Sequence, residues 1–199
     1  MVELIIISYF ILIILFILFI AKLIHISSKL KGKDRKERGK ILKKEWDVKK
    51  TKIKPLLFSI FLPMIIIFIL SLIFGYEKSV NPSFSIDFIF SSLVLAPILE
   101  ELAFRRILLY DIILNRIYKK FGLNWKNERF GVLTAFALSL QALIFVLGHY
   151  DTTLGFSYYG RFFVGFFAGW IYLHNDRNIV YSIVFHFTWN LVIFGMNLI

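Results

Sequence analysis

Long apolar runs, separated by short polar stretches, dominate the pattern of this chain. Most runs approach the roughly 20 residues that a helix needs to cross a bilayer, and few of them contain a charge. We expect helices of this kind at six places, near residues 4–23, 55–74, 85–106, 130–150, 161–174 and 179–199. The pattern predicts an all-α membrane protein, a bundle of about six transmembrane helices with a polar cavity inside it.

Breaks in the pattern place the turns between these helices. Turn-forming or polar residues occur at Gly75 and at residues 81–83, 124–129, 151–159 and 175–178. Within the third helix, Pro97 is expected to cause a kink and to leave backbone carbonyls that need other donors. Beyond this helix the periodicity continues as an amphipathic segment towards residue 120.

Charge is concentrated near the N-terminus. The chain has 24 basic and 13 acidic residues, and residues 22–54 contain 14 of the basic but only 4 of the acidic ones. A basic loop between two spans is typical of the cytoplasmic side of a membrane, next to anionic lipid, and this interpretation is simpler than nucleic-acid binding. We therefore expect both termini outside, no nucleic-acid partner, and two parts: residues 1–54, an N-terminal helix with a basic loop, and residues 55–199, a membrane-embedded domain.

The structure of the basic loop, residues 29–54, is open from the sequence. One interpretation is a surface helix whose apolar residues, with Trp46 at the membrane interface, contact the bilayer. The other is a solvated and partly disordered loop. The helix would be built around Ile41, Leu42, Trp46 and Val48.

Composition supports the membrane assignment and limits the chemistry. Hydrophobic residues make up 58% of the chain, compared with about 45–50% in soluble domains. The chain contains no cysteine, which excludes a disulfide, a thiolate nucleophile and a cysteine-based zinc site.

Two adjacent acids and an arginine interrupt the third apolar run. Glu100 and Glu101 follow an uncharged stretch, and Arg105 lies four residues after Glu101. An acid near the middle of a membrane helix costs roughly 2.5–3.5 kcal/mol, so such residues usually mark functional sites. A spacing of four places Arg105 on the same helix face as Glu101, where the two are expected to pair.

Two later apolar runs each contain a pair of residues at the same spacing of four, and a histidine belongs to each pair. Phe145 precedes His149 by four residues, and His186 precedes Asn190 by four. Each alone has an ordinary structural explanation: a helix–helix hydrogen bond for a histidine or asparagine, core packing for a phenylalanine. Together they indicate one shared polar cavity, because such a cavity would remove the cost of burying polar side chains in apolar segments. Helix rise places His186 roughly 13 Å and His149 roughly 27 Å from their inside turns. Long or tilted helices, or a protruding hairpin at residues 116–129, must remove this mismatch.

Two chemistries fit this set of residues. A carboxylate beside a water is a general base, and His and Asn side chains stabilise an oxyanion. Alternatively, Glu100, His149 and His186 are a possible zinc set. These ligands come from three helices without an HExxH pair, and Asn190 is a poor zinc ligand. We therefore expect catalysis without a metal or other cofactor, with zinc as the alternative.

Three motifs in this order, Glu100-Glu101-x-x-x-Arg105, Phe145-x-x-x-His149 and His186-x-x-x-Asn190, resemble those of the CPBP family. This family comprises CAAX-processing endopeptidases of the Ras-converting type and bacteriocin-processing and immunity proteins, also called Abi. The resemblance covers residues 93–190. It implies an intramembrane endopeptidase in which Glu100 activates water and His149, His186 and Asn190 complete the site, together with Glu101 and Arg105. Arg106 departs from the family, in which a small residue is common there.

Three functions remain open. The first is hydrolysis of a peptide bond in a CAAX-like or bacteriocin-type substrate, either free or membrane-anchored. The second is bacteriocin self-immunity or a membrane scaffold on the same fold, without essential proteolysis. The third is a small transporter or proton relay, which the lack of a visible inverted repeat makes less favourable. For the first two, the resemblance implies a multi-pass protein of a prokaryotic cell membrane.

Overall fold

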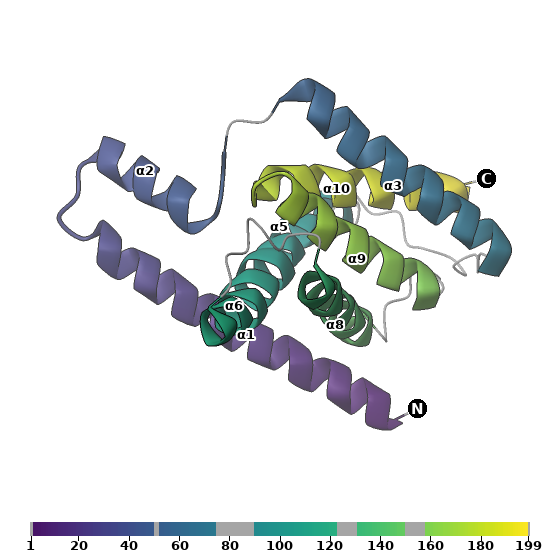
Figure 1. Ribbon diagram of the computed structural model, residues 1–199, viewed down its shortest axis with the longest axis horizontal. Helices are drawn as coiled ribbons and strands as arrows, with labels where there is room; N and C mark the ends of the chain where they lie inside the picture. Colours follow the sequence, from purple (N-terminus) through teal and green to yellow (C-terminus); the bar gives the residue numbers. More distant parts are fainter. Residues whose placement is uncertain (1, 50–51, 75–89, 123–130, 150–157, 199) are drawn as a thin grey trace.

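The chain is helical throughout the residues that its computed structural model describes, which are 2–49, 52–74, 90–122, 131–149 and 158–198. No strand occurs in these ranges, so the all-α prediction is confirmed for them (Figure 1). Two of the elements, written η, are π-helices. The elements are α1 (Val2–Leu30), α2 (Arg35–Glu45), α3 (Ile53–Phe74), η1 (Ser91–Leu95), α5 (Ala96–Glu101), η2 (Leu102–Leu114), α6 (Asn115–Phe121), α8 (Val132–Gly148), α9 (Tyr158–His174) and α10 (Ile179–Leu198).

Some expected boundaries differ from the observed ones. α1 continues to Leu30, seven residues beyond the expected end, and α9 begins at Tyr158, three residues early. The turn at 175–178 is present, with Asp176 and Arg177 in the left-handed backbone region. The turns expected at Gly75, 81–83 and 124–129, most of the one at 151–159, and the helix ends expected at 85, 130 and 150 lie outside the described residues.

The basic loop contains a helix, as one of the two interpretations expected, but α2 ends at Glu45, so Trp46 and Val48 of the four apolar residues expected in it lie beyond its end. α2 begins after Asp34, whose carboxylate caps the helix by accepting a hydrogen bond from the Glu37 N–H at 2.8 Å. After the helix ends, the Trp46 ring packs against Phe19 of α1, with 5.8 Å between ring centroids. α1 and α2 therefore form a hairpin.

α9 lies in the middle of the fold, between α3 and α10 on one side and α8 on the other (Figure 1). One buried apolar cluster joins α3, α9 and α10, and includes Ile67, Ile171 and Phe185. A second joins α9 with η2, α6, α8 and the start of α10, and includes Leu109 and Tyr172. Because α9 contributes to both clusters, it holds the two halves of the core together.

Two glycines of α9 allow a close contact with α8 in the core. A methyl group added at Gly165 would lie 3.2 Å from the Ala142 backbone, and one added at Gly169 would lie 2.7 Å from the Leu138 side chain. Both neighbours belong to α8. The separation of four between Gly165 and Gly169 is a small-xxx-small spacing, which lets two membrane helices approach closely.

Large apolar side chains also cover the outside of the helices. Exposed examples occur on α1, α3 and α8, among them Ile17, Phe61 and Phe136. Within the described residues one helix, α10, is long and apolar enough to cross a membrane, over Ile179–Met196, and two shorter apolar helices are Ile53–Ile67 and Val132–Gly148. An apolar exterior of this extent is typical of a surface that contacts lipid or protein. The six spans stay a prediction.

The run from residue 90 to 121 is one continuous helix that changes its hydrogen-bond register. η1 precedes Pro97, α5 follows, and η2 then runs for 13 residues. In η2 the bonds join residues five apart, which aligns Arg106 with Asp111, and these side chains form an ion pair. On an α-helix a separation of five would place them about 140° apart. The sequence pattern alone did not predict this π-helix.

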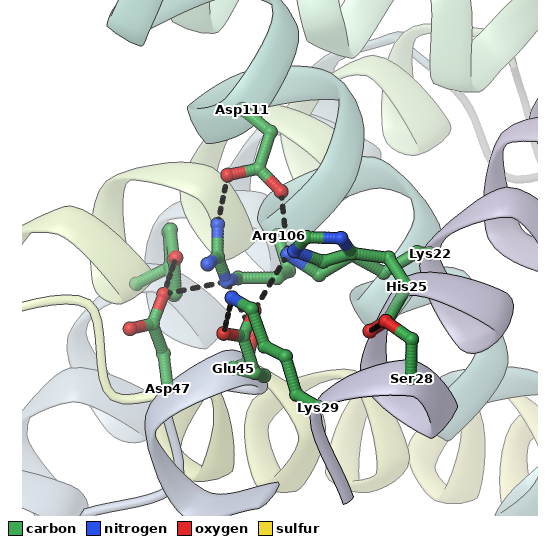
Figure 2. Close-up of polar contacts among 9 residues, drawn as sticks. Lys22, His25, Ser28, Lys29, Glu45, Asp47, Arg106 and Asp111 are labelled. Carbon is green, nitrogen blue, oxygen red and sulfur yellow. Dashed lines mark hydrogen bonds and ion pairs between the residues drawn. The ribbon is translucent and has the colours of Figure 1, made fainter. Parts of the chain in front are cut away.

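Arg106, the residue that departs from the family pattern, connects η2 to the N-terminal hairpin (Figure 2). Its Nε atom lies 3.0 Å from Asp47 and donates to the Glu45 carbonyl at 2.8 Å. Glu45 in turn accepts from Lys29 at 2.6 Å. We call the whole group the junction cluster; it consists of Lys22, Lys29, Glu45, Asp47, Arg106 and Asp111.

Candidate active site

A chain of three buried side chains forms the base of the candidate site. Arg105 binds Glu101 with two parallel hydrogen bonds, from Nε at 2.9 Å and from Nη2 at 3.0 Å. The other side of Glu101 faces His186, whose Nδ1 lies 2.9 Å from Oε1. Arg105 and Glu101 are completely buried. The pair expected from the four-residue spacing is thus present, and it extends to a histidine 85 residues away.

Glu100 points to a different place from Glu101. Its Oε2 atom lies 3.1 Å from Nε2 of His149 and 3.6 Å from Nε2 of His186. About a quarter of the Glu100 side chain is exposed, whereas Glu101 is not exposed at all. Of the two adjacent acids, Glu100 is therefore the one whose side chain is partly exposed, although the Oε2 atom that faces the histidines is itself buried.

The hydrogen bonds of the two histidines define which nitrogen carries a proton. His149 Nδ1 lies 2.7 Å from the Phe145 carbonyl, which only accepts, so this nitrogen donates. His186 Nδ1 likewise donates to the Glu101 carboxylate. Both imidazoles therefore direct Nε2 towards Glu100. The result is a carboxylate that faces two oriented imidazole nitrogens.

Phe145 packs between these groups. Its ring centroid lies 4.2 Å from that of His149 and 5.8 Å from that of His186. The guanidinium carbon of Arg105 lies 5.1 Å from the centre of the same ring, a cation–π distance. Phe145 is thus an apolar wall that fixes the imidazoles and shields the buried ion pair.

Asn190 has a defined partner in the structure. Its amide nitrogen donates to the Ser92 carbonyl at 3.1 Å. In the π register of η1, where Ala96 N–H binds the Ser91 carbonyl, the donor for Ser92 would be residue 97, which is proline and has no N–H. Asn190 therefore supplies a hydrogen bond that Pro97 cannot. This agrees with the expectation that Pro97 leaves carbonyls in need of other donors.

Inclined helix axes bring the two histidines together despite their different depths along their own helices. His149 follows the last residue of α8, whereas His186 is the eighth residue of α10. In Figure 1, α10 lies across the view while α8 is foreshortened. The C-terminal end of α8 can therefore meet the first half of α10.

Arg161 belongs to the surroundings of the site and was not predicted from the sequence. Its Nη1 donates to the His149 carbonyl at 2.6 Å, at the end of α8, where carbonyl groups lack helical partners. The arginine comes from the first turn of α9, 12 residues further along. No motif includes it; the only signal was a charge at the start of an apolar helix.

Metal binding was the alternative chemistry. Among the described residues, no group of three His, Asp or Glu side chains has the arrangement of a metal site. Glu100, His149 and His186 are nevertheless adjacent to one another. The zinc alternative is therefore a matter for experiment.

The candidate site thus combines two adjacent carboxylates with two oriented imidazoles among apolar helices. The model of the family described as "Type II CAAX prenyl endopeptidase Rce1-like" matches residues 81–192, which is 192 − 81 + 1 = 112 of the 199 residues. The chain therefore belongs to this family of membrane-embedded endopeptidases. No curated protein and no solved structure gave a significant match.

The match contains the complete candidate site, from Glu100 to Asn190. It is longer than the resemblance noted from the motifs, which covered residues 93–190. Residues 1–80, including α1, α2 and α3, lie outside it. The junction cluster therefore joins a part of the chain within the match to a part before it.

Proposed function

We propose that this protein is an intramembrane endopeptidase in which Glu100 activates water for attack on a peptide bond. The observation that carries the proposal is the Glu100 carboxylate, on a side chain about a quarter exposed, which faces His149 and His186 at 3.1 and 3.6 Å. A carboxylate in this position is within reach of a water that also contacts an imidazole. The family assignment supports the reaction class.

The proposed reaction has two steps, the addition of water and the release of the amine. Glu100 takes a proton from water while the water oxygen bonds to the scissile carbonyl carbon. The second amide hydrogen of Asn190 and, once the imidazoles are protonated, the Nε2–H groups of His149 and His186 stabilise the resulting oxyanion. The C–N bond then breaks as Glu100 returns the proton to the leaving nitrogen. Arg105 and Glu101 act as positioning residues, because they orient His186 without facing the substrate.

Substitution of Glu100 by Gln tests the proposal. The loss of a general base lowers the rate by about 10²–10⁴-fold, whereas the fold is retained because an amide has nearly the same shape. Cleavage of prenylated and unprenylated peptides with a CAAX terminus, and of bacteriocin-type precursors, is measured in liposomes. Glu37→Gln, in an exposed acid of α2, is the matched control. Normal turnover by both Glu100→Gln and Glu101→Gln would refute the assignment.

We infer that catalysis proceeds without a metal. The enzyme is dialysed against a strong chelator, its metal content is measured, and cleavage is assayed before and after. Activity is expected to persist. A loss that stoichiometric zinc restores would assign Glu100, His149 and His186 as ligands instead.

We further propose a multi-pass topology of six spans, with residues 29–54 in the cytoplasm and residues 55–199 as the catalytic domain. Because the chain has no cysteine, single cysteines report their side of the membrane without background. An impermeant reagent added outside is expected to label Cys at position 83 or 157 but not at position 32. The reverse pattern would contradict this topology.

A further inference from the structure

An open groove lies at the turn between α1 and α2, before the residues that match the family. Its volume is about 620 Å³. Two aliphatic side chains, two hydroxyls and two cations line it: Ile24, Leu30, Ser27, Ser28, Lys31 and Arg38. A groove that combines apolar, hydroxyl and cationic groups is suited to an amphiphilic anion.

The polar side of the groove offers hydrogen-bond donors with positive charge. Arg38 is held in place by a bond from its Nε to the Lys33 carbonyl at 2.6 Å, which leaves its outer nitrogens for a ligand. Lys31 is exposed, and within the described ranges no hydrogen bond or ion pair is recorded for its ammonium group. Ser28 donates to the His25 carbonyl at 2.7 Å, and its oxygen can still accept (Figure 2).

The acids of this region do not neutralise the groove, because each has another partner. Asp34 caps α2, and Glu37 lies 3.6 Å from Lys33. Glu45 and Asp47 belong to the junction cluster. Six of the eleven residues of α2 are Lys or Arg, and all six are exposed. The surface around the groove is therefore strongly cationic.

An apolar stripe along α1 leads to the groove. Ile13, Ile17, Ile20 and Ile24 recur at helical spacing on one face, and all are exposed. Ser27 and Ser28 continue the same face at its polar end. Lys22 and Lys29 project from the opposite face, about 180° away at 100° per residue, where they dock α1 on the core. The stripe thus faces away from the protein over about 17 Å of helix.

We propose that the groove binds the headgroup of an anionic phospholipid, whose acyl chain lies along the isoleucine stripe of α1. The cations and the Ser27 hydroxyl donate to the phosphate, and the stripe supplies the apolar surface that a free phosphate would not use. Attraction of about 1 kcal/mol per basic residue near an anionic lipid makes binding roughly thirty-fold weaker when two cations are removed.

The test uses the full chain in a neutral detergent. Thermal unfolding is followed while phosphatidylglycerol, phosphatidylcholine or glycerol phosphate is added. Phosphatidylglycerol alone is expected to raise the midpoint, and high salt is expected to weaken this effect. In the double variant Lys31→Gln/Arg38→Gln, the phosphatidylglycerol concentration that gives half of the maximum rise in the midpoint is expected to be roughly thirty-fold higher. Lys119→Gln/Lys120→Gln, two exposed cations of α6, is the matched control and behaves like the wild type.

Three outcomes would overturn the proposal. An equal shift with phosphatidylcholine would show that the charge of the headgroup has no role. An equal shift with glycerol phosphate would show a simple anion site without an acyl chain. An unchanged response of Lys31→Gln/Arg38→Gln would place the lipid elsewhere. Native mass spectrometry of retained phosphatidylglycerol gives a second measurement that does not depend on unfolding, and all of these readouts are independent of proteolysis.

Discussion

Arg105 and Arg106 are neighbours on one helix, yet they enter two different charged clusters. Arg105 is completely buried and binds a single carboxylate, that of Glu101. Arg106 lies at the edge of the core and contacts Asp47, Asp111 and the Glu45 carbonyl. We call the first group the site cluster; it consists of Glu100, Glu101, Arg105, His149 and His186.

The two clusters differ in how much water reaches their charges. In the site cluster the Glu101 and Arg105 side chains are 0% exposed. In the junction cluster Asp111 is 30% and Lys29 is 43% exposed, whereas Arg106 and Asp47, at 9% and 8%, form its buried end. Charges are costly to bury and interact more strongly where water is excluded. An unpaired charge is therefore far more harmful in the site cluster, and the junction cluster serves mainly to dock one segment on another.

The largest effect is expected for Arg105→Met. This change leaves Glu101 buried without its cation, which costs about 3–5 kcal/mol, and it releases His186 from its orientation. Activity and thermal stability should both fall sharply. Stability is measured by unfolding in detergent, and the double variant Glu101→Gln/Arg105→Met should recover most of it without recovering activity. Normal stability of Arg105→Met would mean that water reaches Glu101 and replaces the lost cation.

Arg161→Gln should come next and should affect activity more than stability. It removes the donor to the His149 carbonyl, and displacement of a reacting group by about 1 Å costs on the order of 100-fold in rate. We expect kcat to fall by about 10–100-fold with little change in KM, and Arg161→Lys to restore part of it. A change in KM alone would show that Arg161 contacts the substrate instead of positioning His149.

Arg106→Gln should destabilise the protein by roughly 2 kcal/mol, since hydrogen bonds to charged groups contribute about 1.5–3 kcal/mol. The activity of the folded fraction should be nearly unchanged, in contrast to Arg105→Met. Unfolding and cleavage are measured on the same preparation. A loss of kcat as large as that of Arg105→Met would mean that the two clusters are coupled through η2.

The smallest effect concerns pH and Glu45. Burial raises the pKa of this carboxyl, but hydrogen bonds and charges from Lys29 and Lys22 outweigh it, so the pKa is below its ordinary value. The folded state therefore favours the charged form. The stability that the charged Glu45 carboxylate contributes is fully present above about pH 4.3 and is lost as the pH falls through the lowered pKa. Stability should decline more steeply below pH 4.3 in the wild type than in Glu45→Gln.

Spacing along the sequence predicted the local part of this architecture. The all-helical fold followed from the apolar runs, and the Glu101–Arg105 pair followed from a separation of four. These features depend on residues within one helix, whose relative positions are set by helix geometry.

Contacts between distant segments could not be predicted in the same way. Arg106 meets the Glu45 carbonyl across 61 residues, and Arg161 reaches His149 from another helix. Their partners depend on how the helices pack, which apolar periodicity does not specify. The π-helix η2 was missed because a mixed run of apolar and charged residues fits separations of four and of five almost equally well.

The hydrogen bond from Asn190 to Ser92 couples the residue types at positions 97 and 190, which can mutate independently of each other. Proline at position 97 creates the need for a donor, and asparagine at position 190 meets it. A residue with a backbone N–H at position 97 would make that bond redundant and would release the Asn190 amide into the site. A loss of Pro97 would therefore remove the structural need for a donor one turn beyond His186, and only the oxyanion role proposed for Asn190 would then favour asparagine there.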